Sequence, residues 1–182
     1  KPSETKKVEN KVINLVFAGN IGEAQSVETI VFAANELKEN NKFHFHIVGD
    51  GSKYKSCLDL AKKLSLSNIT FYGRLDLSEM PKFYNLADAM LLTLINDESL
   101  SYTLPGKVQT YLAAGKPIIG AINGEGANLI NESGCGLVCN AEEYIKLSQL
   151  ITELDINKLS SYSKAAKRSE EHTSELQSLS HL

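Results

Sequence analysis

Short apolar runs alternate along the chain with longer segments in which apolar residues recur every three or four positions. The short runs predict β-strands at residues 14–18, 44–48, 69–72, 89–94, 117–121 and 137–139. The longer segments predict helices at residues 27–39, 54–64, 80–86, 106–114, 127–131 and 142–150, with another beginning near residue 156. This alternation indicates an α/β fold, a Rossmann-like parallel sheet with helices on both faces. Most of the strands are unbroken apolar runs, as expected when both sheet faces are covered.

The composition fits one globular domain. Of the 182 residues, 42% are hydrophobic and 23% are charged, which are ordinary values for such a domain. The net charge of −3 argues against a nucleic-acid partner, because nucleic-acid-binding domains usually carry a basic surplus. No apolar run approaches the roughly 20 residues of a membrane-spanning helix, and the chain begins without a signal-peptide pattern. We therefore expect a cytoplasmic protein.

Neither the cysteines nor the histidines form a metal-binding pattern. Cys57, Cys135 and Cys139 are odd in number and contain no CxxC pair, which favours reduced, buried thiols over a disulfide framework or a zinc site. His44 and His46 alternate on one face of a predicted strand, but no third ligand is near in sequence. We expect the two histidines to pack, and we expect no metal and no cofactor.

The two ends of the chain differ from the segment between them. Residues 1–11 are polar and lysine-rich, like the trailing end of an interdomain linker, and residues 12–167 contain the predicted elements. In the last segment, RSEEHTSELQS resembles the in-frame translation of a sequencing adapter and has no apolar periodicity. We expect residues 168–182 to be an artefactual or disordered tail that contributes nothing to the fold.

Residues 104–121, LPGKVQTYLAAGKPIIGA, predict a loop, one amphipathic helix and a short strand. Pro105 suits a helix start, and Gly115 followed by Pro117 ends the helix. The unpaired amides and the positive end of the helix dipole make the start of this helix an anion site. Lys107 lies in the first turn, where the dipole disfavours a cation. A lysine at that position suggests a bound negative group, above all a phosphate.

The same segment resembles the corresponding part of retaining GT-B glycosyltransferases of the group 1, family 4 type, especially the aminosugar-transferase branch of bacterial polysaccharide biosynthesis. Residues 17–30 (FAGNIGEAQSVETI), 45–64 (FHIVGDGSKYKSCLDLAKKL) and 69–94 (ITFYGRLDLSEMPKFYNLADAMLLTL) agree in order and spacing. The resemblance covers about residues 12–136. Members of this family have two Rossmann-like domains, and this chain resembles only the C-terminal one, which binds the nucleotide sugar. The resemblance therefore implies one half of a GT-B fold.

The first candidate phosphate-binding loop is Gly19-Asn20-Ile21-Gly22, after the first predicted strand. Its glycines let backbone amides approach a phosphate closely, although it is not a GxGxxG fingerprint. In the resembling family this region supplies an Arg and a Lys to the diphosphate, and here Asn20 and Gln25 stand near those positions. The resemblance thus assigns phosphate contacts to Gly19, Asn20, Gly22 and Gln25. A tight strand–helix turn is the alternative.

Two further loops are candidates through the resemblance. The nucleotide base is assigned to Gly73, Arg74 and Leu75, mainly through their backbone, although a solvated surface position suits Arg74 equally well. Many relatives carry two glutamates separated by seven residues, and Tyr102 and Thr110 stand at those positions here. Thr110 can still hydrogen-bond a ribose hydroxyl, less strongly than a carboxylate. The other candidates belong to the same loop, for which a plain Ser/Thr-rich turn is the alternative: Ser99, Ser101, Thr103, Leu104, Pro105 and Gly106.

The resemblance implies the donor-binding domain of a retaining glycosyltransferase. It would take a nucleoside-diphosphate sugar, which we expect to be UDP-linked, and serve a glycan or lipid-linked acceptor bound through the missing N-terminal domain. Lys107 is the candidate catalytic residue, because a cation at a helix start can stabilise the departing diphosphate without a metal. The resemblance leaves room for peripheral association of the full-length protein with the inner face of the cell membrane.

Two alternatives stay open. The first is a sugar-nucleotide epimerase of the same GT-B architecture, against which the shortage of carboxylates and histidines in the candidate loops counts. The second is a nucleotide-binding interaction module that catalyses no reaction. The absence of the glutamate pair is compatible with this alternative.

Overall fold

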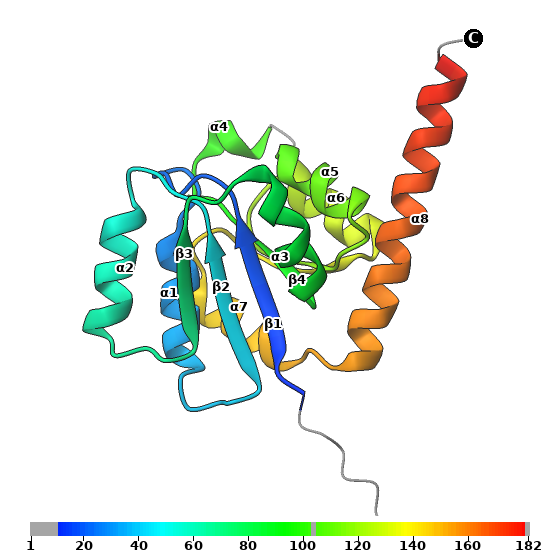
Figure 1. Cartoon of the computed structure of the whole chain (residues 1–182). Helices are drawn as coiled ribbons and strands as arrows, with labels where there is room; N and C mark the ends of the chain where they lie inside the picture. Colours follow the sequence, from blue (N-terminus) through cyan, green and yellow to red (C-terminus); the bar gives the residue numbers. More distant parts are fainter. Residues whose placement is uncertain (1–10, 103–104, 181–182) are drawn as a thin grey trace, which may run out of the picture.

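The computed structural model describes residues 11–102 and 105–180, and its centre is one parallel β-sheet covered by helices (Figure 1). The six strands lie in the order β3-β2-β1-β4-β5-β6, and every neighbouring pair is parallel. The predicted α/β fold with a parallel sheet is therefore confirmed. The strands are β1 (Ile13–Ala18), β2 (Phe43–Val48), β3 (Ile69–Gly73), β4 (Ala89–Thr93), β5 (Ile118–Ala121) and β6 (Gly136–Cys139).

Helices cover both faces of the sheet, and each face has its own apolar core. One core contains side chains of α1, α2 and α7, packed on residues such as Leu15 and Phe17 of β1. The other contains side chains of α3, α5, α6 and α8, packed on Val16 of the same strand. The helices are α1 (Val27–Glu36), α2 (Tyr54–Lys63), α3 (Met80–Leu86), α4 (Glu98–Ser101), α5 (Gly106–Ala113), α6 (Glu125–Ser133), α7 (Tyr144–Thr152) and α8 (Ile156–Ser180), with a 3-10 turn at Leu77–Glu79.

The predicted strand and helix boundaries lie within three residues of those observed. The 3-10 turn and α4, both short, were not predicted. The three cysteines are buried thiols, as expected, and burial raises the pKa of Cys57 to about 12. No described helix is long and apolar enough to cross a membrane.

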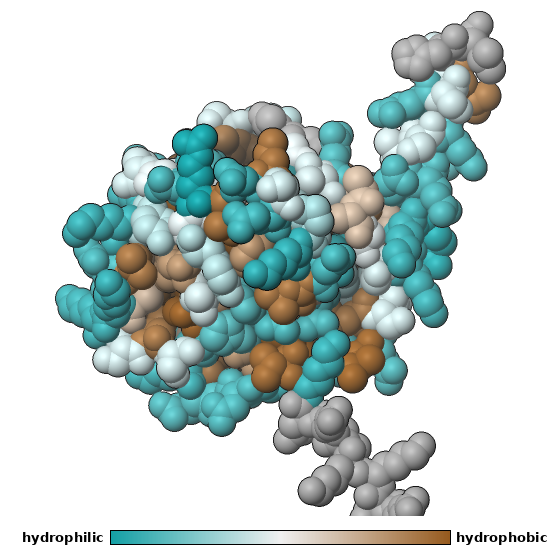
Figure 2. All heavy atoms as spheres, in the orientation of Figure 1, coloured by the Kyte–Doolittle hydropathy of each residue, from teal (hydrophilic) through white to brown (hydrophobic). Residues whose placement is uncertain are grey.

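The structure differs from a disordered tail in that α8 continues without a break to Ser180, and the expected artefactual origin of residues 168–182 stays a prediction. The helix is anchored by Leu159, Ala165 and Ala166, which are buried. Beyond them the sequence contains neither Gly nor Pro, so an anchored helix can continue through residues of fair helix propensity. The second half of α8 projects from the body and is mostly hydrophilic (Figures 1 and 2), and residues 171–180 are all exposed. That the tail contributes nothing to the fold stays a prediction.

The sheet has a switch point between β1 and β4, which are neighbours in the sheet but not along the chain. From β1 the chain moves outward through β2 to β3, and from β4 it moves outward the other way through β5 to β6. In open α/β sheets, ligands bind beyond the carboxyl ends of the strands at such a switch point. A ligand site is therefore expected at the loops after β1 and β4 and at the start of α5.

Candidate functional site

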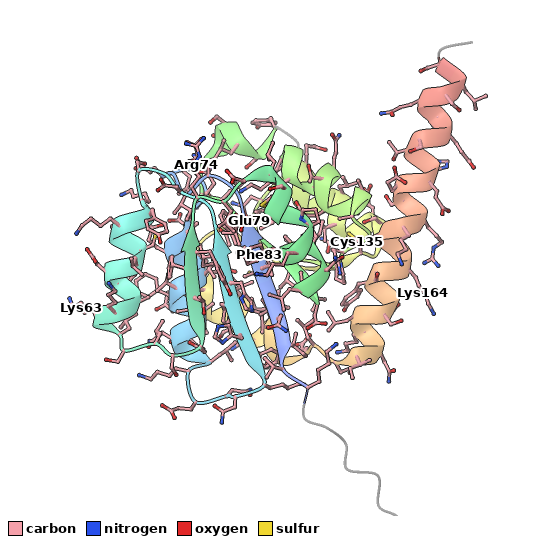
Figure 3. All side chains as sticks on the ribbon, in the orientation of Figure 1. Lys63, Arg74, Glu79, Phe83, Cys135 and Lys164 are labelled. Carbon is pink, nitrogen blue, oxygen red and sulfur yellow. The ribbon has the colours of Figure 1, made fainter. Side chains whose placement is uncertain are left out.

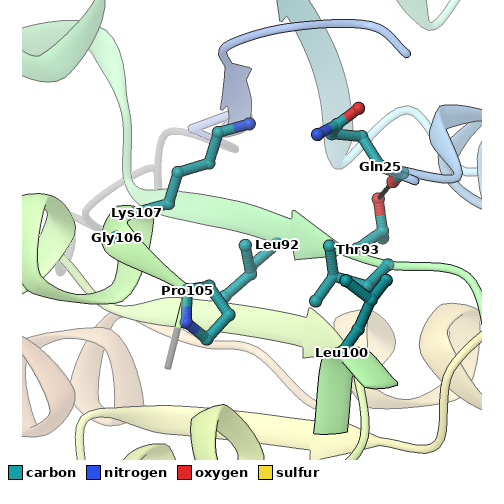
Figure 4. Close-up of a pocket in the computed structure, with 8 residues that line it drawn as sticks. Gln25, Leu92, Thr93, Leu100, Pro105, Gly106 and Lys107 are labelled. Atoms are coloured by element: carbon teal, nitrogen blue, oxygen red, sulfur yellow. Dashed lines mark hydrogen bonds between the residues drawn. The ribbon is translucent and has the colours of Figure 1, made fainter. Parts of the chain in front are cut away.

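A pocket of about 220 Å³ lies beyond the carboxyl ends of β1 and β4, at the switch point of the sheet (Figure 4). Four of the predicted site residues line it, namely Gln25, Pro105, Gly106 and Lys107. The end of β4 and α4 supply the rest of its wall, with Leu92, Thr93, Leu94 and Leu100. Lys107 is the one ionisable side chain among these lining residues. The pocket therefore offers positive charge and hydrogen-bond donors to a ligand.

Lys107 lies in the first turn of α5, and its side chain reaches over the end of β1. Its Nζ atom is buried and has no hydrogen-bond partner among the described residues. The nitrogen lies 4.1 Å from the centroid of the Phe17 ring. It also occupies the space that a Cβ at Gly19 would need, so the glycine is required for this placement. Burial lowers the pKa of Lys107 to about 8.

Gln25 faces Lys107 from the opposite wall of the pocket and is held from two sides. Its Oε1 accepts a hydrogen bond from the backbone N–H of Gly22 (3.0 Å) and a longer one from Nδ2 of Asn20 (3.4 Å). Its backbone carbonyl accepts a hydrogen bond from the hydroxyl of Thr93 (2.6 Å). With Oε1 engaged, the amide nitrogen points across the pocket toward the ammonium of Lys107 (Figure 4). Two hydrogen-bond donors thus face each other across the pocket.

The first predicted loop is locked against the neighbouring loop after β2. The N–H of Gly19 donates to the carbonyl of Val48 (3.0 Å), and the N–H of Ile21 donates to that of Asp50 (2.9 Å). Gly49 has a φ of +133°, and a side chain there would overlap the carbonyl oxygen of Gly19. This close approach fixes the Gly19–Gly22 turn beside the pocket, as a site for backbone recognition requires.

A buried tyrosine fixes α5, the helix that carries Lys107, to the sheet. The Tyr111 hydroxyl donates to the carbonyl oxygens of Ala18 (3.3 Å) and Leu91 (3.4 Å), one on β1 and one on β4. Val108 and Leu112 on the same side of the helix are also buried. The first turn of α5 is thereby held over the gap between the two strands.

The base-binding candidates lie away from this pocket. Gly73 ends β3 with a φ of +71°, and its carbonyl accepts a hydrogen bond from the N–H of Gly49. Arg74 is exposed and stands at the carboxyl edge of the sheet (Figure 3), whereas Leu75 is half-buried. Their assignment to a nucleotide base stays a prediction.

The described polar candidates of the loop before α5, and Thr110 within α5, are engaged in local hydrogen bonds. The Ser99 hydroxyl and N–H both donate to Oδ1 of Asp97, which caps α4. The hydroxyl of Ser101 makes a long hydrogen bond to the Asp97 carbonyl (3.5 Å). The exposed Thr110 donates its hydroxyl to the Gly106 carbonyl (3.2 Å), which leaves it only acceptor capacity toward a ligand. Thr103 and Leu104 lie outside the described residues.

A polar network that the sequence did not suggest ties three loops of the carboxyl edge together. The N–H of Asn96, after β4, donates to the Glu142 carboxylate (2.9 Å), after β6. Nδ2 of Asn123, after β5, donates to Oδ1 of Asn96 (3.1 Å). Glu142 has a φ of +65°, an uncommon conformation for a residue other than glycine. The network braces the segment that carries α4 and its pocket residue Leu100.

The two histidines are engaged in the sheet. His46 bonds the Tyr72 hydroxyl (2.7 Å) and the Asn14 side-chain oxygen (2.8 Å), and His44 bonds the Thr70 hydroxyl (2.8 Å). Burial lowers the pKa of His46 to about 4. Residues 11–102 and 105–180 contain no cluster of three His, Cys, Asp or Glu side chains with the geometry of a metal site.

Comparison with known proteins agrees with this architecture. Residues 13–155 match the family described as glycosyl transferases group 1. The "Probable glycosyltransferase WbjE" of Pseudomonas aeruginosa is 32% identical over 142 residues, which make up 76% of this chain and 34% of that protein. The chain thus spans about a third of the length of this curated relative.

Solved structures show the same fold at low sequence identity. The C-terminal domain of LpcC, a glycosyl transferase group 1 family protein from Francisella tularensis, is 15% identical with a TM-score of 0.71, over 85% of this chain and 82% of that one. Anabaena HepE, solved in complex with UDP, is 15% identical with a TM-score of 0.76, over 94% of this chain and 50% of that one. The expected half of a GT-B fold is confirmed. Because the family match covers most of its length, the chain belongs to the glycosyl transferases group 1 family.

Proposed function

We propose that this domain binds the nucleoside-diphosphate sugar donor of a retaining glycosyltransferase, and that the donor is UDP-linked. The observation that carries the proposal is the unpartnered, buried ammonium of Lys107, which faces the amide of Gln25 at the switch point. An ammonium without a partner is costly to bury, so a pocket built around one is suited to an anionic ligand. HepE, which shares this fold, was solved with UDP, and this supports the choice of nucleotide.

In this proposal Lys107 is the catalytic residue. Negative charge builds on the β-phosphate as the sugar–oxygen bond of the donor breaks. A fixed ammonium, with the amide of Gln25 and the start of α5 beside it, would stabilise that charge without any change of geometry during the reaction. The acceptor, a glycan or a lipid-linked sugar, would be bound by the part of the protein that this chain does not span.

Calorimetry of the chain with UDP and with NAD tests the proposal. We expect measurable binding of UDP and weaker binding of NAD, because the loop after β1 is not a dinucleotide fingerprint. Lys107→Ala should weaken UDP binding by about 1.5–3 kcal/mol, the usual contribution of a charge-assisted hydrogen bond. Lys116, beyond the other end of α5, donates to the Ala87 carbonyl, and Lys116→Ala is the control that should bind normally. Binding of NAD without measurable UDP affinity would overturn the proposed function.

A further inference from the structure

The ammonium of Lys107 rests against an aromatic ring that belongs to the other core of the sheet. Phe17 is fully buried in the core under α1 and α7, whereas α5 packs into the core on the opposite face. The lysine side chain therefore passes over the carboxyl edge of β1 before its Nζ meets the Phe17 ring, 4.1 Å from the centroid. The missing side chain at Gly19 leaves the space that this path needs.

The ring is the one favourable electrostatic contact that the described residues give this nitrogen. The nitrogen is buried and makes no hydrogen bond. The residues that face it from the loop after β1, from β4 and from the start of α5 are Gln25, Leu92, Thr93, Pro105 and Gly106, and none of them carries a charge. Desolvation disfavours the charged form of a lysine, whereas the negative face of an aromatic ring attracts a cation, most strongly where water is excluded.

We propose that Phe17 is a positioning residue for Lys107, and that its ring holds the ammonium at the carboxyl edge of β1 and keeps it protonated while no anion is bound. The inference rests on the proposed function only in assigning a phosphate as the anion that the held ammonium meets. It gives a core phenylalanine a role that packing alone does not require, because another apolar side chain could fill the same volume.

The direct test is the pKa of Lys107, followed by NMR of lysine side chains labelled with carbon-13 in the full chain. Phe17→Leu removes the ring face, and we expect the pKa to fall by about one unit, from the usual strength of a desolvated cation–π contact. Replacement of Phe17 by pentafluorophenylalanine keeps an aromatic ring at this position and depletes its negative face, so the Lys107 pKa should fall in this variant as well. This second variant decides the question if Phe17→Leu does not fold.

Phe45 provides the matched control. It is fully buried in the same core, on the neighbouring strand β2, and the same two replacements there should leave the Lys107 pKa unchanged. An unchanged pKa in the Phe17 variants would overturn the proposal. So would an equal fall in the Phe45 variants, because loosening of the core would then be the cause.

UDP binding gives a second readout that separates this inference from the proposed function. If the Lys107 pKa falls from about 8 to about 7, its protonated fraction at pH 8 falls about fivefold. Phe17→Leu should therefore bind UDP about fivefold more weakly than the parent at pH 8, and equally well at pH 6. An equal loss at both pH values would contradict the proposed effect of the ring on the protonation of Lys107. Failure of the parent to bind UDP would reject the proposed function, while the pKa comparison would still decide the role of Phe17.

Discussion

Replacement of Lys107 by methionine should make the protein more stable while it weakens nucleotide binding. The charge of Lys107 is buried without a hydrogen-bond partner, which opposes folding. Methionine has a similar length and no charge, and its thioether packs well against an aromatic ring such as that of Phe17. A residue that reduces stability at a ligand-facing position is characteristic of functional sites.

The magnitude follows from the pKa of Lys107, which burial lowers from 10.5 to about 8. Each unit corresponds to about 1.4 kcal/mol, so the charged form opposes folding by on the order of 3 kcal/mol. Between pH 8 and 10.5 the unfolded chain binds more protons at this lysine than the folded protein does, so this contribution makes the parent more stable as the pH rises through that window. Below pH 8 the cost is constant. The advantage of Lys107→Met should therefore be largest at neutral pH and shrink above pH 8.

Urea unfolding of the parent and of Lys107→Met, at intervals from pH 6.5 to pH 10, measures this difference. The comparison cancels the titration of the other lysines and tyrosines. Lys55→Met is the control, because Lys55 is 88% exposed in its ion pair with Asp59, and its free energy of unfolding should change by less than about 0.5 kcal/mol. A Lys107→Met variant no more stable than the parent at pH 7, or a gain that does not decrease with pH, would refute the reasoning.

Three further predictions concern the pocket and the tail. Gly19→Ala should weaken UDP binding at least tenfold by calorimetry, because its Cβ would meet the Lys107 ammonium; unchanged affinity would show that binding does not require the ammonium at this place. Gln25→Glu should also weaken UDP binding by about tenfold or more at low salt, because a carboxylate would face the diphosphate; unchanged affinity would show that residue 25 does not face the phosphates. Removal of the chain after Lys167 should leave the midpoint of thermal unfolding unchanged, because residues 171–180 are all exposed, and a fall of several degrees would contradict this.

The local pattern of the sequence predicted most of the fold, because its strands and helices have strong periodicities. Unbroken apolar runs specify buried parallel strands, and Gly115 with Pro117 marks the end of α5. The turns that were missed, at Leu77–Glu79 and at α4 (Glu98–Ser101), are too short to have a periodicity of their own. Residues 168–180 have no apolar periodicity and yet lie in α8, because a helix anchored at one end can continue without packing.

The candidate site was predictable only in part, because its geometry depends on contacts between distant segments. The first-turn position of Lys107 is a local signal, and it indicated the start of α5, where the structure has a pocket. The contact of Lys107 with Phe17 depends on the adjacency of β1 and β4, which no local pattern specifies. The same holds for the hydrogen bonds between Asn96, Asn123 and Glu142, whose residues are up to 46 positions apart along the chain.

The way α5 is attached has a mechanical consequence for the sheet. β1 pairs with β4 at Leu15–Ala89 and Val16–Met90, whereas β1 and β2 are paired along six positions. The junction of the two halves is therefore the least extensively paired part of the sheet, and Tyr111 spans it, because its hydroxyl proton is shared between a carbonyl oxygen of β1 and one of β4. A nucleotide held between Gln25 and Lys107 would add a second tie across the same junction. Ligand binding should then stiffen the two halves of the sheet as one body, and slow amide hydrogen exchange within β1 and β4 as well as in the loops that touch the ligand.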